Sequence, residues 1–130
     1  MAQIVGELIL RALSAATGSY TGATTSAATL NRPTGAPNGN IGLQMGGTFV
    51  LDCTTSAGTN RRMFVEILGQ FDAGDTLFRL EGVRFGAITS TGAQSIYYPG
   101  VLPPNLFVST TINGTGSPSF THAVKCYALG

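Results

Sequence analysis

Residues 98–129 read Tyr-Pro-Gly-Val-Leu-Pro-Pro-Asn-Leu-Phe-Val-Ser-Thr-Thr-Ile-Asn-Gly-Thr-Gly-Ser-Pro-Ser-Phe-Thr-His-Ala-Val-Lys-Cys-Tyr-Ala-Leu, and this stretch decides the fold class. Its prolines block entry into a helix, and Asn113-Gly114 supplies residues that tolerate the positive φ of hairpin turns. The runs 106–112 and 119–129 are rich in β-branched and aromatic residues. The stretch therefore predicts a loop, a strand, a glycine-rich turn and a closing strand that joins a sheet.

Strand-like runs continue upstream, separated by turn residues at 54–60, 74–75 and 91–92. The runs cover residues 41–45, 47–53, 62–71, 76–85, 88–90 and 94–98. Strands at this spacing favour a sandwich or a barrel. We therefore expect an all-β fold, a jelly-roll-like β-sandwich over residues 41–130, preceded by an extended N-terminal segment over residues 1–40. The expected core consists of Leu43, Phe49, Leu51, Val65, Ile67, Leu80, Val108 and Val124.

Residues 3–13 fit two secondary-structure templates. As a helix they place Glu7 and Arg11 four residues apart on one face, and as a strand they alternate, with Ile9 and Leu13 on the face opposite Leu8. The β context favours a strand or an extended arm. Residues 14–40 carry few strand signals, so we expect residues 1–40 to pack on the sheet or on neighbouring subunits. Their removal is then expected to leave a folded sandwich that no longer binds its partner.

The chain carries unusually little charge. Charged residues make up 10% of its 130 residues, against about 25% in an average soluble domain. A surface with so few charges is poorly protected against association, which favours a protein that binds other proteins. The formal net charge is +1 and only Arg61 and Arg62 are adjacent basic residues, so nucleic-acid binding is not expected. No apolar run reaches the 18 residues of a membrane span, and residues 1–13 lack a basic leader.

The side chains that could carry chemistry are few and scattered. Cys53 and Cys126 lie in predicted strands and are interpreted as small buried side chains, with a disulfide as the alternative. His122 is expected on the surface of the last strand. Metal-ligand spacings and phosphate-binding loops are absent from the sequence. We therefore predict no catalytic residue, no cofactor, no metal and no small-molecule substrate.

The region from Gly47 to Leu129 resembles small virion proteins of tailed phages, of the capsid decoration or cement type. The resemblance is carried by the order of the following pieces: Gly47–Asp52, Phe64–Gly69, Thr91-Gly92, Tyr98–Gly100, Leu102-Pro103 and Gly116–Phe120. It implies a jelly-roll-like protein, made in the host cytoplasm, that sits on the outside of an icosahedral head. It also implies contacts with the major capsid protein and a homo-oligomer, with a trimer favoured.

The candidate partner-contacting residues are the exposed-looking apolar, aromatic and basic positions outside the expected core. They are Ile4, Leu8, Arg11, Tyr20, Arg32, Pro33, Arg61, Arg62, Tyr97 and Tyr98. Two alternatives remain open. The first is another virion location, such as the tail, the neck or a fibre base. The second is a small carbohydrate-binding module, for which Tyr20, Tyr97 and Tyr98 would supply the stacking rings.

Overall fold

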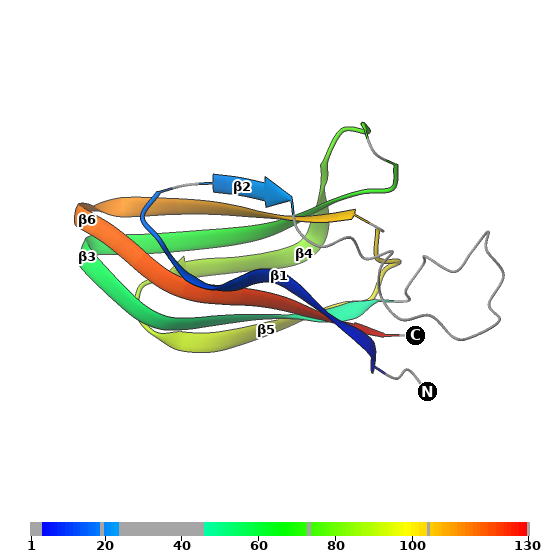
Figure 1. Cartoon of the computed structure of the whole chain (residues 1–130), viewed down its shortest axis with the longest axis horizontal. Coiled ribbons are helices and arrows are strands. Elements are labelled where there is room, and N and C mark those ends of the chain that lie inside the picture. Colours follow the sequence, from blue (N-terminus) through cyan, green and yellow to red (C-terminus); the bar gives the residue numbers. More distant parts are fainter. Residues whose placement is uncertain (1–3, 19, 24–45, 73, 104, 130) are drawn as a thin grey trace, which may run out of the picture.

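The computed structural model describes residues 4–18, 20–23, 46–72, 74–103 and 105–129. These ranges form six strands and no helix, so none of them offers a helix suited to crossing a membrane. The strands are β1 (Ile4–Ala16), β2 (Tyr20–Ala23), β3 (Gly47–Gln70), β4 (Phe78–Ile88), β5 (Gly92–Tyr98) and β6 (Asn105–Leu129) (Figure 1). The all-β prediction is confirmed, and so is the strand favoured over residues 3–13.

The two longest strands, β3 and β6, pair along their whole length and bend together. Residues 47–53 of β3 pair with 122–128 of β6, whereas residues 62–70 of β3 pair with 105–113 of β6. Register shifts between Cys53 and Arg62 interrupt the ladder at the bend, where both strands fold back on themselves (Figure 1). The turns predicted at 54–60 and at 113–116 therefore do redirect the chain, but as bends within continuous strands.

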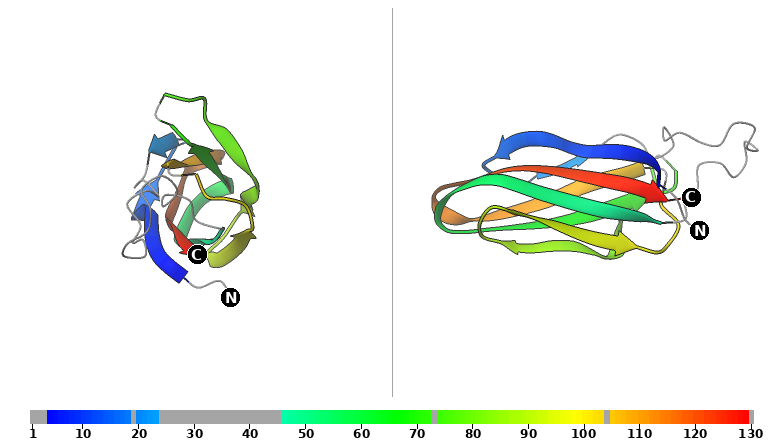
Figure 2. Two further views of the ribbon diagram at one scale, coloured as in Figure 1. Left: turned by 90° about the vertical axis from the view of Figure 1, so that its right-hand side faces the viewer. Right: turned by 90° about the horizontal axis from the view of Figure 1, so that it is seen from below.

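The bend gives the sheet two layers. The first layer has the order β1, residues 119–129 of β6, residues 47–57 of β3, then β5. The second layer has the order β2, residues 105–113 of β6, residues 62–70 of β3, then β4. Eight segments in two layers of four are the jelly-roll arrangement, so the jelly-roll-like prediction is confirmed by strand order. Figure 2 shows the first layer face-on in its right view and the enclosed interior in its left view.

The core fills the space between the two layers. In β3 the inward positions alternate with outward ones on both sides of the bend, as the two-residue period of a strand requires. Every predicted core residue that the structure describes is buried, and Leu43 lies outside the described residues. Each large apolar side chain buried here stabilises the fold by about 1.5–3 kcal/mol.

The first strand is part of this core. Leu8 and Leu10 of β1 are buried at 2% and 5% exposure, and Ala16 closes the same face. Pairing with β6 runs from Ile4 opposite Leu129 to Ala16 opposite Phe120. Leu8 was a predicted partner contact, and that prediction is wrong because its side chain points between the layers.

Candidate functional site

The two cysteines are buried and free. Cys53 lies opposite His122 in the ladder and Cys126 lies opposite Phe49, four residues further along β3. Four strand residues span about 13 Å, well beyond the Cα separation that a disulfide bridges. Burial raises the pKa of Cys126 to about 12 and also raises the pKa of Cys53. Both thiols therefore stay protonated at neutral pH, and their interpretation as small buried side chains is confirmed.

His122 belongs to the core. It is 0% exposed and shares the inward face of β6 with Phe120, Val124 and Cys126. Its Nδ1 lies 3.2 Å from the carbonyl oxygen of Phe120, so this nitrogen carries the proton and donates. Burial lowers its pKa, and the charge of Arg11 acts in the same direction. The predicted surface position is wrong because the two-residue alternation that buries Phe120 and Val124 also buries the residue between them.

In the part of the chain that the structure describes, His, Cys, Asp and Glu side chains form no group of three that could hold a metal ion. The features that stand out are instead on the surface. The outer face of the first layer carries a shallow groove of 560 Å³, which we call the apolar groove. Its lining residues are Ile9, Arg11, Ala12, Leu13, Val50, Asp52, Ala93, Ala123, Lys125 and Tyr127.

The apolar groove owes its character to β1. Ile9 is 49% exposed and Leu13 is 55% exposed, although both are large and apolar. Register shifts on either side of Arg11 bulge this strand, and Arg11 Nη2 donates to the carbonyl oxygen of Ser14 at 3.1 Å. Bulges at a sheet edge redirect side chains and discourage pairing with another strand. The edge therefore offers its side chains, rather than its backbone, to a partner.

Three of the ten residues that line the apolar groove are charged: Arg11, Asp52 and Lys125. Lys125 Nζ lies 3.5 Å from Glu7 Oε1, and the two side chains are 40% and 42% exposed. An exposed pair of this kind contributes little stability, about 0–1 kcal/mol. The groove therefore offers both apolar and charged side chains to a partner, and protein–protein interfaces combine the two.

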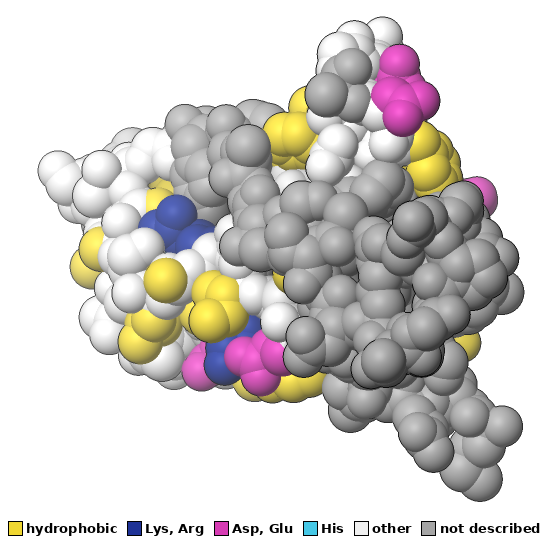
Figure 3. Space-filling model, turned by 45° about the vertical axis from the view of Figure 1, so that its right-hand side comes forward, with side chains coloured by type: hydrophobic (Ala, Val, Ile, Leu, Met, Phe, Trp, Pro, Cys, Tyr) yellow, Lys and Arg dark blue, Asp and Glu magenta, His cyan; other side chains and the backbone are white. Residues whose placement is uncertain are grey.

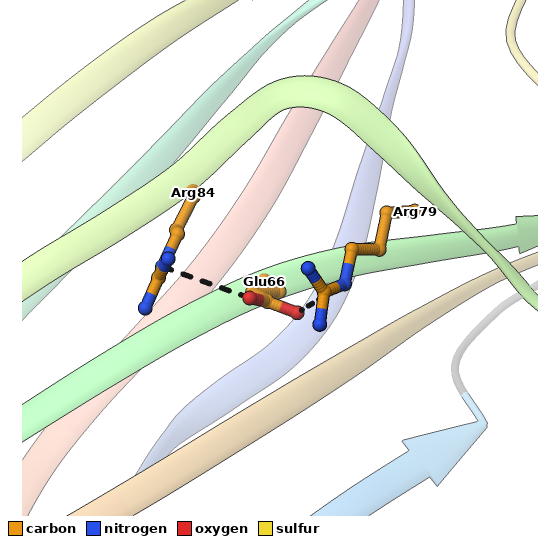
Figure 4. A network of polar contacts seen from close by, with 3 residues as sticks. All are labelled: Glu66, Arg79 and Arg84. Atoms are coloured by element: carbon orange, nitrogen blue, oxygen red, sulfur yellow. Dashed lines mark ion pairs between the residues drawn. The ribbon is translucent and has the colours of Figure 1, made fainter.

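The outer face of the second layer differs in chemistry. Glu66 lies between two arginines, with Oε2 at 3.2 Å from Arg79 Nε and Oε1 at 3.6 Å from Arg84 Nε (Figure 4). The Arg84 guanidinium also lies 5.4 Å from the ring centroid of Phe64. These side chains satisfy one another across β3 and β4. The outer face of the second layer thus carries a connected network of charges.

The predicted contact residues fall in different places. Arg11 lines the apolar groove. Tyr97 is 57% exposed, whereas Tyr98 is half-buried and packs against the core. Successive strand residues point to opposite faces, so the two tyrosines of β5 do not form one aromatic platform of the kind that a carbohydrate-binding module uses.

Four further candidates cannot be placed in the same way. Arg32 and Pro33 lie outside the described residues. Ile4 lies in β1 and Tyr20 lies in β2, where their backbones pair with β6, but their side chains lie outside the described set. Contacts through these four residues stay predictions.

Arg61 and Arg62 have different roles although they are adjacent. Arg61 Nε donates to Ser56 Oγ at 3.0 Å, and its Nη1 donates to the carbonyl oxygen of Gly58 at 2.9 Å. These bonds hold the bend of β3, where Gly58 and Asn60 have positive φ angles of 106° and 52°. Arg62 is exposed. The structure therefore gives Arg61 a role in shaping the bend.

Replacing Arg61 by Ala is expected to lower the free energy of unfolding by about 1 kcal/mol, because two half-buried hydrogen bonds are lost. Arg62→Ala is the matched control, with an expected change within about 0.5 kcal/mol. Urea denaturation of the two variants and the unaltered protein measures both values. Equal effects at the two positions would contradict the structural role of Arg61.

The strand alternation of residues 3–13 already indicates part of the apolar groove. Read as a strand, residues 3–13 place Ile9, Arg11 and Leu13 on one face and Leu8 on the other. The candidates Leu8 and Arg11 were thus drawn from opposite faces. Val50 and Tyr127 carried no comparable signal, since their outward direction depends on the register of β3 with β6.

The chain matches no family model and no curated protein. It is similar to two solved structures of infectious bursal disease virus. The Gx strain structure shares 12% identity at a TM-score of 0.48, with 99% of this chain and 32% of that chain covered. The Gt strain structure shares 13% identity at a TM-score of 0.47, with 99% and 31% covered. The chain thus spans about a third of the length of these two chains, and the jelly-roll assignment rests on strand order alone.

Proposed function

We propose that this chain is a structural protein of a virus particle, and that it acts as cement on the outside of an icosahedral phage head. In this role it binds major capsid protein subunits and strengthens the contacts between them. Such a protein needs no chemical step. It needs a rigid scaffold and a surface from which water is readily displaced.

The observation that carries the proposal is the apolar groove on the outer face of the first layer. Ile9 and Leu13 expose about half of their surface there, beside the half-buried Val50 and Tyr127. Large apolar side chains that gather on a surface with polar residues at the rim mark an interaction site. The low charge of the whole chain, 10%, supports the same conclusion because it leaves few solvated groups to strip on binding.

The jelly-roll order supplies the rigidity. β6 lies between β1 and β3 in the first layer and between β2 and β3 in the second, so the groove floor is fixed by a strand that spans both layers. A partner binding to this surface does not have to order it first, and preorganisation of this kind lowers the cost of association.

Copy number tests the proposed location. Purified particles of the virus that carries this gene are expected to contain on the order of hundreds of copies, while a tail, neck or fibre-base component is present in about 3 to 18 copies set by its closed symmetry. Quantitative mass spectrometry of the particles against isotope-labelled peptides gives the number. A chain that is absent from the particles, or present in a few copies, would contradict the cement role.

Substitution in the apolar groove tests the surface. Leu13→Asp is expected to reduce occupancy of the particles at least about tenfold, because a buried interface anchor is replaced by a charge that must be desolvated. Val101→Asp is the matched control, since Val101 is also exposed and apolar but does not line the groove. Particles assembled without the protein are incubated with each variant and the bound fraction is measured. Equal losses for the two variants would exclude the groove as the contact.

A further inference from the structure

The connection between β3 and β4 projects from the body of the molecule (Figure 1). Phe71 and Phe78 flank it, 46% and 38% exposed, with stacked rings whose centroids lie 5.7 Å apart. Asp72 and Asp75 are exposed beside them, and Figure 3 shows acidic side chains at the tip of the projection. We call these four residues the aromatic–acidic hairpin. Two large apolar rings kept in water beside carboxylates mark an interaction site.

The aromatic–acidic hairpin is fixed in place before it meets any partner. The Asp75 backbone N–H donates to the carbonyl oxygen of Asp72 at 3.1 Å, which closes the turn. Gln70 Nε2 donates to the carbonyl oxygen of Asp75 at 2.9 Å, and Asn105 Nδ2 donates to Gln70 Oε1 at 3.3 Å. The hairpin is therefore tied to β6, and little conformational entropy remains to be lost on docking.

The other end of the second layer carries a surface of opposite charge. A hollow of 420 Å³ is lined by Asn60, Arg61, Arg62 and Thr89, and we call it the basic hollow. The side chain of Arg62 forms no hydrogen bond or ion pair with the residues that the structure describes, and Arg61 is already oriented by its bonds to the bend. Nine residues of extended β3 separate Arg62 from Phe71, about 30 Å. The two surfaces of one molecule therefore cannot meet.

Arginine is the side chain that suits both parts of the aromatic–acidic hairpin. Its planar guanidinium stacks on aromatic rings and forms paired hydrogen bonds with carboxylates. The other arginines of the second layer, Arg79 and Arg84, are engaged by Glu66. We propose that the aromatic–acidic hairpin of one copy of this chain docks into the basic hollow of a second copy.

Such a contact joins two different surfaces, so each copy keeps one hairpin and one hollow available for the next. A contact of this type builds a closed ring when the rotation between copies closes, and an open chain when it does not. A trimer is one of the closed forms. The inference does not depend on attachment to a virus particle, because it concerns only contacts between copies.

Sedimentation velocity of the full chain tests the inference. At about 100 µM, oligomers larger than dimers are expected at about 50 mM salt and largely monomers at about 500 mM, because salt screens exposed ion pairs. Asp72→Lys/Asp75→Lys and Arg62→Ala are each expected to weaken association at least about tenfold. Glu81→Lys is the matched control, since Glu81 is exposed but belongs to neither surface, and it is expected to associate as the unaltered protein does.

Mixing the two disrupted variants gives the sharpest result. The hairpin variant keeps an intact hollow and Arg62→Ala keeps an intact hairpin, so an equal mixture is expected to form dimers and nothing larger. A contact of hairpin with hairpin, or of hollow with hollow, cannot give this outcome. Circular dichroism of each variant confirms that the fold is retained. A monomeric unaltered protein, variants that associate normally, or a mixture that stays monomeric would each overturn the proposal.

Discussion

Removal of residues 1–40 is expected to leave a chain that does not fold, in contrast to the removable arm that the sequence suggests. β1 contributes Leu8, Leu10 and Ala16 to the core, and its loss also leaves the edge of β6 without a paired strand from residue 120 to residue 129. Each buried leucine is worth about 2–5 kcal/mol in Leu→Ala substitutions, against a total stability of about 5–15 kcal/mol for a domain. Circular dichroism of the truncated chain should lose the cooperative thermal transition.

Point substitutions separate the packing role of β1 from the effect of shortening the chain. Leu8→Ala is expected to lower the free energy of unfolding by about 2–5 kcal/mol. Leu13→Ala, on the same strand but exposed to solvent, is expected to change it by less than about 0.5 kcal/mol. Urea denaturation of both variants provides the comparison. A stable, cooperatively melting truncated protein would show that β1 is dispensable for the fold.

Stability is expected to fall as the pH drops below about 6.5, because His122 must stay neutral in the folded state. Burial lowers the pKa of His122 below its ordinary value, so in this pH window the unfolded chain binds a proton that the folded chain does not. Stability then decreases with falling pH by up to about 1.4 kcal/mol per pH unit until the folded pKa is reached. Above about pH 7 both states are neutral at this residue and its contribution is constant.

The chain has one histidine, which makes this prediction easy to isolate. Urea denaturation at pH values from about 7.5 down to about 5 gives the slope for the unaltered protein. His122→Gln keeps a side-chain donor near the Phe120 carbonyl oxygen but does not titrate, so the variant should lack this fall in stability and the difference between the two curves should change with pH. A constant difference across the whole range would mean that His122 does not cause the acid sensitivity.

The fold class was predictable because strand alternation is a local property. Phe49 and Leu51, or Val65 and Ile67, identify the buried face of β3 without knowledge of any partner strand. The same rule could have placed His122 in the core, since Phe120 and Val124 flank it at two-residue spacing. His122 is polar, but the alternation of its strand decides its position, and it is fully buried.

The bends and the surfaces were harder to predict because they depend on pairing between distant residues. Glycine and asparagine at 58–60 and at 113–116 indicate that the chain turns, but only the ladder between β3 and β6 shows that pairing continues through the turn. The structural role of Arg61 was not predictable, because its bonds to Ser56 and Gly58 form only when the strand is bent. The apolar groove likewise joins residues of β1, β3 and β6 that the sequence keeps far apart.

The central position of β6 in both layers has a consequence for biosynthesis. Ile4 pairs with Leu129, and Gly47 pairs with Ala128. During synthesis, β1 and β3 therefore lack their pairing partner until β6 has been made. Neither layer can be completed while residues 105–129 are still inside the ribosome. Topologies dominated by such distant pairings fold slowly, over milliseconds to seconds. Until then the apolar faces of β1 and β3 stay uncovered, and exposed surface of this kind favours aggregation of the unfinished chain.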